Sequence, residues 1–320
     1  MLLELDDPRW TSFVDSRADA LPYHHPAWAG VLRDTYGYRC FALLGEGGGL
    51  PLAETRGRRW VSLPFTDECP PLGAVEELLQ AARAEHGVRR IDIHAAAAGF
   101  PVAAGVAHTL PLEPDEDAVY ARVRKTQVRQ PIEKATRDGV VVRAAGARRD
   151  LTGVFYDLHV RTRRRHGVPV QPRRFFDLLW ERIVEPGLGF VLVAEAGGVP
   201  VAAAVFLTWN GTVTYKYSAS DPAHWRLRPN NLVLWTAIRR GCLEGYRTFD
   251  LGRSESGNRG LRAFKAGWGA AERPLVYTVV ADEAPRAAGG RAAAMLAPVI
   301  RRSPAIVCRG VGELLYKYAA

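Results

Sequence analysis

The sequence predicts an α/β protein in which one unit, built on a mixed and mostly antiparallel sheet, occurs twice in tandem. The second half of the chain shows a strand, a hairpin, a helix and two further strands in that order. The first half shows the same element order more weakly and without a sequence repeat. A chain of 320 residues is long enough for two domains with separate cores.

The hairpin of the second half carries the clearest local signal. Residues 199–209 and 212–218 are strand-like, and Asn210-Gly211 between them is the dipeptide that most strongly favours a two-residue hairpin turn. A further strand is expected just upstream, at residues 190–194. Together these segments predict a three-stranded antiparallel meander.

A helix and two strands follow the hairpin. Apolar side chains recur at helical spacing at Leu232, Trp235, Ile238 and Cys242. Strands are expected at residues 249–251 and 274–281, and residues 252–269 between them resemble a glycine- and charge-rich loop. Upstream of the meander, residues 151–184 predict two helices that are interrupted around residues 167–172.

The first half of the chain predicts the same order of elements. Strands are expected at 41–44, 51–54 and 59–63, a helix at 74–85, and further strands at 90–94 and 108–112. We therefore predict a first domain over residues 1–145 and a second over 146–299. A helix within residues 300–320 is expected to dock back on the first domain.

The net charge of +9 is compatible with several classes of binding partner and does not distinguish between them. It suits a nucleic acid, a phosphorylated substrate or an anionic membrane surface, and equally an arginine-rich composition without a polyanionic partner. The chain has no apolar run of transmembrane length and no basic segment that opens a signal peptide, so a cytoplasmic location is expected. The four cysteines are too far apart to predict a disulfide framework or a zinc site.

Residues 119–142, between the two halves, are strongly basic. The basic side chains are Arg122, Arg124, Lys125, Arg129, Lys134 and Arg137. Apolar residues on one side, with Pro131 bending or restarting the segment, suggest a helix. Two interpretations remain open, a solvated linker helix and a cationic ridge at an inter-domain cleft.

The order of a meander, a helix and two strands is similar to that of acetyltransferases with the GNAT fold. In that fold, a glycine-rich turn before the central helix binds the pyrophosphate of coenzyme A through backbone amides. This chain has RLRPNN at residues 226–231, with Pro229 in place of the first glycine. Proline has no N–H group, and Asn231 adds a side chain where the backbone must approach closely. We therefore expect an acyl donor other than coenzyme A.

Three stretches between Tyr215 and Tyr277 carry a more specific resemblance. They read YKYSASD, RPNNLVLWTAIRRGCLEGYRTFDLGRS and GLRAFKAGWG, followed by PLVY. They resemble the FemABX family, in its single-chain form without a coiled-coil arm. Weaker matches are RKTQVRQPIEKATRDGVVV, LHVRTRRRHGVPVQPRRFF, YHHPAWAGVLRDTYGY and SLPFTDECPPLG. The resemblance touches most of the chain but is distinctive only between 215 and 277.

This resemblance implies an aminoacyltransferase that moves an amino acid from aminoacyl-tRNA to an amine and forms a peptide bond. It implies no cofactor apart from aminoacyl-tRNA as co-substrate. The acceptor would be a peptidoglycan precursor, a small peptide of secondary metabolism or another nucleotide-linked amine. The resemblance also implies that the protein could make peripheral contact with a membrane-bound precursor. The tRNA contacts are then expected at Arg124, Lys125, Arg129 and Lys134.

Lys265 matches the lysine of the family's Phe-Lys pair, which the resemblance places beside the reacting ester. Aminolysis of an ester passes through a tetrahedral oxyanion, and a positioned cation stabilises that charge. Phe264 and Trp268 are expected to form the walls of the site and limit water. The alternative is a lysine that extends from a loop into solvent.

The other expected substrate contacts are cations and aromatic residues. The resemblance implies that Arg165 and Arg33 bind phosphate groups of the acceptor. It also implies that the substrates are contacted by Trp28, Arg253 and Tyr217. An arginine guanidinium binds phosphate in a bidentate manner, which suits that task. Arg165 lies in a run of four arginines over 161–165, so a solvated side chain is the competing interpretation.

A general base is not evident. Asp67 at a strand end is the candidate carboxylate, although an acid of a surface turn would look the same. No histidine has a serine and an acid at a spacing that predicts a hydrolase triad, and no metal-ligand cluster is present in the sequence. Two other functions remain open, an acyl-CoA-dependent N-acyltransferase of the GNAT type and a non-enzymatic RNA-binding protein.

Overall fold

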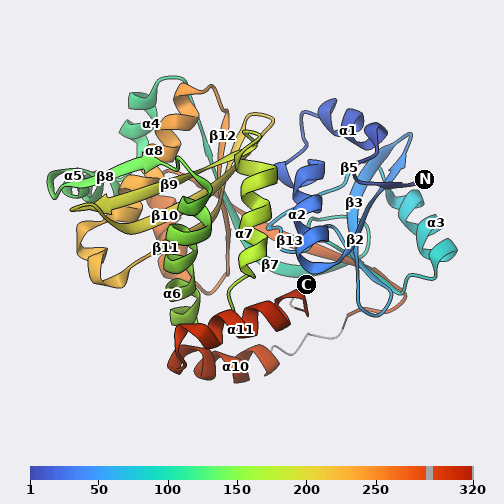
Figure 1. Ribbon diagram of the computed structural model, residues 1–320. Coiled ribbons are helices and arrows are strands. Elements are labelled where there is room, and N and C mark those ends of the chain that lie inside the picture. The colour runs from blue at the N-terminus through green and yellow to red at the C-terminus, as the bar shows by residue number, and fades with distance from the viewer. Residues whose placement is uncertain (286–290, 319–320) are drawn as a thin grey trace. The chain divides into compact units, whose positions relative to one another are not determined.

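The computed structural model describes residues 1–285 and 291–318, and the chain divides into two compact units. The first unit is formed by Met1–Val106 and Arg273–Ala288, and the second by Ala107–Glu272 and Gly289–Ala319. Figure 1 shows the helices and strands of both units with their labels.

The first unit has a sheet of strand order β1-β2-β3-β4-β6-β13, with β5 paired to β3. Its strands are β1 (Leu2–Glu4), β2 (Arg39–Gly45), β3 (Gly48–Thr55), β4 (Arg59–Val61), β5 (Leu72–Gly73), β6 (Arg90–Ile93) and β13 (Ala271–Ala281). Its helices are α1 (Pro8–Asp15), α2 (Pro26–Tyr36) and α3 (Glu76–His86). The β4–β6 pair is parallel and the other pairs are antiparallel. The strands predicted at 41–44, 51–54, 59–63 and 90–94 and the helix predicted at 74–85 are therefore present, while β1, β5, α1 and α2 were not predicted.

The second unit has the strand order β7-β12-β11-β10-β9-β8. These strands are β7 (Phe100–Pro111), β8 (Val140–Ala144), β9 (Gly189–Ala196), β10 (Val199–Trp209), β11 (Thr212–Ser220) and β12 (Thr248–Ser254). The helices are α4 (Glu116–Arg122), α5 (Gln130–Arg137), α6 (Tyr156–His166), α7 (Arg173–Leu179), α8 (Pro229–Leu243), α9 (Arg259–Gly267), α10 (Arg291–Arg302) and α11 (Ala305–Leu315). The β11–β12 pair is parallel, whereas β8 to β11 form an antiparallel meander.

The predicted hairpin turn is present between β10 and β11. Asn210 and Gly211 have φ values of 45° and 74°, and Trp209 pairs with Thr212 across the turn. Two successive positive φ angles are what a two-residue hairpin turn of this type requires, and Asn-Gly is the dipeptide that tolerates them best. This local chemistry explains why the hairpin could be predicted.

The sheet of the second unit is packed on both faces. Ala202, Ala204 and Phe206 of β10 join the core cluster with α8 residues such as Leu234 and Ile238. The intervening Ala203 and Val205 are also buried, and side chains alternate between the faces of a strand. Helix α8 contacts β8 to β11, while α6 contacts β10 and β11 (Figure 1).

Residues 259–267 form helix α9, where the sequence suggested a loop. The side chain of Asn258 accepts a hydrogen bond from the backbone N–H of Leu261 at 3.1 Å, which caps the helix. Lys265 and Trp268 turn toward the protein interior. Burial of this face, rather than helix propensity, therefore stabilises a short helix in a glycine-rich sequence.

The domain limits and the C-terminal helix differ from the prediction. Residues 107–145 belong to the second unit, and so do α10 and α11, which both pack on α6. Gly312 of α11 lies so close to Val170 that a Cβ atom there would be 1.9 Å from its carbonyl oxygen. Cys308 donates to Val168 O at 3.6 Å. The small residues of α11 permit this close approach, which a search for apolar periodicity does not detect.

Candidate functional site

The side chain of Lys265 extends from α9 to the end of β12. Its ammonium donates hydrogen bonds to Gly252 O at 2.8 Å and to Arg253 O at 3.0 Å, and the residue is 4% exposed. Burial of an ammonium is costly unless acceptors replace water. The two carbonyl oxygens supply that compensation, so a positive charge is held at a defined point between α9 and β12.

The two aromatic neighbours of Lys265 occupy different environments. Phe264 is partly buried, and its ring lies edge-on to Trp268 with centroids 6.1 Å apart. Trp268 is completely buried and joins the core cluster that contains Val123 and Val128. We predicted that both rings form walls of a site, but burial makes Trp268 the anchor of α9 and leaves Phe264 to shape the surface.

An ionic group lies beside Lys265. Arg262 donates one hydrogen bond to each carboxylate oxygen of Glu272, at 2.9 and 2.6 Å, and one of these oxygens also approaches His108 on β7. His108 Nε2 and Glu272 Oε2 are 3.9 Å apart, and His108 has no exposed surface. Three groups from β7, α9 and β13 are therefore brought together with the ammonium.

The charges around His108 favour its neutral form. Burial lowers the pKa of His108, the Lys265 ammonium and the Arg262 guanidinium lower it further, and the Glu272 carboxylate acts in the opposite direction. The hydrogen bonds from Arg262 lower the pKa of Glu272. Near neutral pH the group thus contains a neutral imidazole, one carboxylate and two cations.

Several buried polar atoms near Lys265 have no hydrogen-bond partner among the residues that the structure describes. They are both ring nitrogens of His108, Oγ of Ser254 and Nε1 of Trp268. Ser254 follows directly after Arg253, whose carbonyl binds Lys265, and Trp268 closes α9. Native proteins leave few buried polar groups unpaired, so a group of them indicates a place where water or a substrate binds.

The basic segment predicted for tRNA adjoins α9. The backbone N–H of Arg124 donates to Gly267 O at 2.8 Å, and Gln127 contacts the same glycine. The side chains of Arg124 and Lys125 are exposed. Residues 125–129 form a single π-helical turn before α5. The structure therefore connects this cationic surface to the helix that carries Lys265.

The other two residues predicted to contact tRNA are engaged within the protein. The guanidinium of Arg129 lies over the ring of Tyr120, 5.9 Å from its centroid. Lys134 forms an ion pair with Asp138 at 2.5 Å, one turn further along the chain. Of the four predicted contacts, Arg124 and Lys125 are thus the more accessible.

Arg165 and Tyr217 lie in another part of the second unit. The guanidinium of Arg165 stacks on Trp225, 4.7 Å from the ring centroid, and burial lowers its pKa. Tyr217 on β11 contacts an aromatic cluster that includes His159 and Phe176. Arg165 is therefore not simply solvated, because a flat aromatic ring fixes the orientation of its guanidinium.

Three predicted residues belong to the first unit. Arg33 is exposed and forms ion pairs with Asp34 at 3.0 Å and Asp6 at 3.3 Å. Trp28 is completely buried and packs edge-on against another ring, so it is a core residue. Asp67 is partly buried, and its backbone oxygen accepts a hydrogen bond from the Tyr277 hydroxyl at 2.8 Å.

The beginning of α8 differs from a phosphate-binding turn. Pro229 occupies the first helical turn and Arg228 before it has a φ of 58°. The N–H of Asn231 donates to Arg228 O at 3.1 Å, and the Asn230 side chain binds Ser220. One backbone amide is absent and another is already bonded, so this turn offers little to a pyrophosphate.

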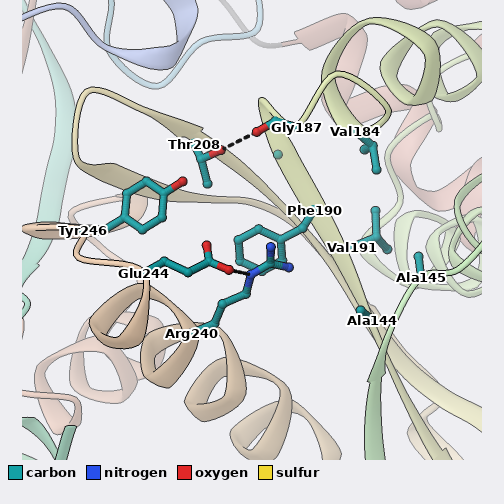
Figure 2. Close-up of a pocket in the computed structure, with 11 residues that line it drawn as sticks. Ala144, Ala145, Val184, Gly187, Phe190, Val191, Thr208, Arg240, Glu244 and Tyr246 are labelled. Carbon is teal, nitrogen blue, oxygen red and sulfur yellow. Dashed lines mark hydrogen bonds and ion pairs between the residues drawn. The ribbon is translucent and has the colours of Figure 1, made fainter. Parts of the chain in front are cut away.

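A cavity of about 260 Å³ opens elsewhere in the second unit, at the far end of α8 (Figure 2). Arg240 and Glu244 form an ion pair at 2.7 Å there, and the Arg240 guanidinium lies 4.2 Å from the centroid of the Phe190 ring. Thr208 donates to Gly187 O at 3.4 Å. The described residues that line the cavity include none of the predicted site residues, and its one cation is already paired.

No sequence pattern singles out His108, Glu272 or Ser254. His108 and Glu272 are far apart in the chain and meet because β7 and the first residues of β13 lie in one unit. A histidine in an apolar strand was the available signal. Among the described residues, no group of three or more His, Cys, Asp or Glu is placed to hold a metal ion. No helix there has the length and apolarity to cross a membrane.

Comparison with known proteins assigns the fold. An acetyltransferase (GNAT) domain model matches residues 122–266, from the basic segment to the residue after Lys265. The FemX structure is similar, with a TM-score of 0.66 and 13% identity over 87% of this chain and 96% of that chain. L-PGS from Bacillus licheniformis gives 0.60 and 14%, over 94% and 99%. A tandem GNAT protein from the clavulanic acid biosynthesis pathway gives 0.52 and 11%, over 89% and 99%. No curated protein matches.

The protein has a tandem GNAT-like fold. This confirms the predicted class, an α/β protein with mixed, mostly antiparallel sheets. The fold is of the acyltransferase type, and the identities are too low to carry a substrate from these structures to this chain. The function of this chain therefore has to be inferred from the residues of its own site.

Proposed function

We propose that this protein is a tRNA-dependent aminoacyltransferase, which moves an amino acid from the ester of an aminoacyl-tRNA to an amine acceptor. The observation that carries the proposal is the fixed ammonium of Lys265 on α9, with a cationic segment hydrogen-bonded to the end of the same helix. Charge stabilisation and RNA binding are the two requirements of the reaction, and the residues that we propose for both adjoin α9.

The acceptor nitrogen attacks the ester carbonyl carbon, and a C–N bond forms as the carbonyl oxygen becomes an oxyanion. Collapse of this intermediate breaks the C–O bond to the terminal adenosine, whose oxygen takes the proton that the amine releases. The Lys265 ammonium stabilises the oxyanion, which is the charge that develops only along the reaction. The unpaired buried groups of Ser254 and His108 mark where a polar substrate group or water would bind beside it.

The state of His108 suits this role of Lys265. A protonated imidazole would place another positive charge beside the ammonium, and burial together with Lys265 and Arg262 keeps the ring neutral. The amine proton can pass directly to the leaving oxygen, so no protein base is required. Asp67 remains a candidate for proton transfer, and Arg165, Arg253, Arg33 and Tyr217 remain candidates for substrate binding.

The acceptor is an amine of a peptidoglycan precursor, of a small peptide or of a nucleotide-linked compound. The stacked guanidinium of Arg165 supports an acceptor with phosphate groups, because its orientation is fixed before binding. No cofactor other than the charged tRNA is needed. Charged tRNA is found in the cytoplasm, which is where we propose that the protein acts.

An acyl-CoA-dependent N-acyltransferase is the second candidate, because the acetyltransferase domain model matches residues 122–266. The start of α8 argues against it, since Pro229 lacks an N–H group and the Asn231 amide is already bonded. A thermal shift with coenzyme A but none with charged tRNA would favour this candidate.

The decisive experiment incubates the protein with a mixed pool of charged tRNAs and a panel of amine acceptors, followed by mass spectrometry. We expect an acceptor that gains the mass of one amino-acid residue, and no gain when the ester is hydrolysed beforehand. A product formed from acyl-CoA in the absence of charged tRNA would overturn the proposal.

A further inference from the structure

Exposed apolar side chains are concentrated on the last two helices of the second unit. Thirteen large hydrophobic residues are exposed in the part of the chain that the structure describes, and six lie within residues 296–318. They are Leu296, Val299, Ile306, Leu314, Leu315 and Tyr318. Single exposed apolar residues are ordinary, but a group of this size on one short segment indicates a surface that binds something.

On α11, Ile306 and Leu314 form an apolar stripe opposite the docked face. Cys308, Gly312 and Tyr316 recur at every fourth position and are buried. Ile306 and Leu314, on the other side of the helix, are 74% and 70% exposed. One face of α11 thus belongs to the core of the unit, while an apolar face is directed to solvent.

The same segment is basic. Residues 296–318 contain Arg301, Arg302, Arg309 and Lys317, against Glu313 as the one acid. Glu313 accepts a hydrogen bond from the backbone of Arg173 at 3.0 Å, and Arg309 pairs with Asp157 at 2.7 Å. These contacts attach the edges of α11 to α6 and α7. Arg302 at the end of α10 and Lys317 just after α11 are exposed.

We propose that the outer face of α10 and α11 binds the surface of an anionic lipid bilayer. Helices of 12 and 11 residues are too short to span a membrane, which takes about 20 residues. An apolar stripe with basic residues beside it is the pattern of a helix that lies in the interface between headgroups and acyl chains. This surface does not depend on the proposed reaction, although it would bring the enzyme to a lipid-linked acceptor.

A second copy of the chain fits this face less well. A two-fold symmetric interface places the same patch on both sides, so Arg302 and Lys317 of one copy would face a like-charged patch. A bilayer with anionic headgroups accepts both the apolar side chains and the positive charge. Charge complementarity therefore favours the lipid surface as the occupant.

Sedimentation of the full-length protein with large unilamellar vesicles tests the proposal. We expect binding to vesicles of phosphatidylcholine with 30% phosphatidylglycerol, little binding to pure phosphatidylcholine, and loss of binding as salt is raised. The double variant Ile306→Ser/Leu314→Ser, and separately Arg302→Glu/Lys317→Glu, should each weaken binding roughly tenfold or more.

The matched control is Leu243→Ser/Val141→Ser, because these residues are 66% and 64% exposed but lie outside the C-terminal helices. It should bind vesicles like the wild type. Circular dichroism verifies that all variants remain folded. Equal binding to both vesicle types, wild-type binding by the Ile306/Leu314 variant, or a dimer whose formation that variant abolishes would overturn the proposal. Aminoacyl transfer to a soluble acceptor should be unchanged in these variants, which separates this outcome from failure of the proposed function.

Discussion

Lys265 on α9 donates a hydrogen bond of 2.8 Å to the carbonyl oxygen of Gly252 near the end of β12. A second bond, to the carbonyl of Arg253, makes the contact a bridge between the helix and the strand. The ammonium therefore has two consequences in one position. It stabilises the local structure, and in the proposed reaction it supplies the charge that stabilises the oxyanion.

The first prediction separates these two consequences. Lys265→Met keeps an unbranched side chain but removes the charge and the donors. It should lower kcat by about 10²–10³ and destabilise the protein by about 1–3 kcal/mol, because two buried carbonyls lose their partner. Single-turnover kinetics and thermal unfolding measure the two effects.

Lys265→Arg and Phe264→Ala are the companions of that variant. The planar guanidinium is larger and should restore little of kcat, while Phe264→Ala should have a smaller effect that acts mainly through substrate positioning. Near-wild-type turnover in Lys265→Met, accompanied by lower stability, would assign the lysine a purely structural role.

The second prediction concerns pH and His108. Burial and two nearby cations lower the pKa of His108 in the folded state, so the unfolded chain takes up a proton first as the pH falls. Its contribution to stability is complete above the unfolded pKa of about 6.5 and is lost progressively below it. We expect the fall in Tm from pH 7.5 to pH 5.5 to be smaller in His108→Gln than in the wild type.

Glu272→Gln provides the converse test. The carboxylate of Glu272 raises the pKa of His108, so its removal should lower that pKa further. The loss of Tm on acidification should then be larger than in the wild type. An identical pH dependence in wild type, His108→Gln and Glu272→Gln would show that His108 does not titrate as its surroundings indicate.

The third prediction concerns RNA. Neutralising Arg124, Lys125 and Arg129 to glutamine should weaken tRNA binding and reduce the slope of log K against log salt by roughly 2–3, if each side chain contacts one phosphate. Binding titrations at several salt concentrations measure both quantities. The control replaces Arg148, Arg239 and Arg240, which are paired with acids in the same unit, by glutamine. Equal losses in both triple variants would mean that only net charge matters.

The fourth prediction concerns the docking of α11. A Cβ atom at Gly312 would lie 1.9 Å from the Val170 carbonyl oxygen, so Gly312→Ala should destabilise this contact by about 1–3 kcal/mol. Limited proteolysis should then cleave the C-terminal segment sooner. Gly310→Ala is the control, because nothing lies within 4 Å of a Cβ there and alanine favours the helix. Similar proteolysis of the two variants would contradict the observed packing.

The sequence alone determined those features that depend on neighbours in the chain. Asn210-Gly211 predicted the β10–β11 turn because positive φ angles are a property of the residues themselves. The spacing of Leu232, Trp235, Ile238 and Cys242 predicted α8, because one turn of helix repeats every 3.6 residues. The resemblance around Lys265 identified the central residue of the proposed site, although not its environment.

The tertiary structure decided what those residues can do. His108, Lys265 and Glu272 meet only after β7, α9 and the start of β13 have assembled, and the burial that lowers the pKa of His108 has no local signature. The same holds for α9, which forms because its inner face is buried, and for α11, which approaches Val170 closely because Gly312 has no side chain. Local dihedral preferences and periodicity can be read along the chain, whereas close approach and desolvation arise only from contacts between distant segments.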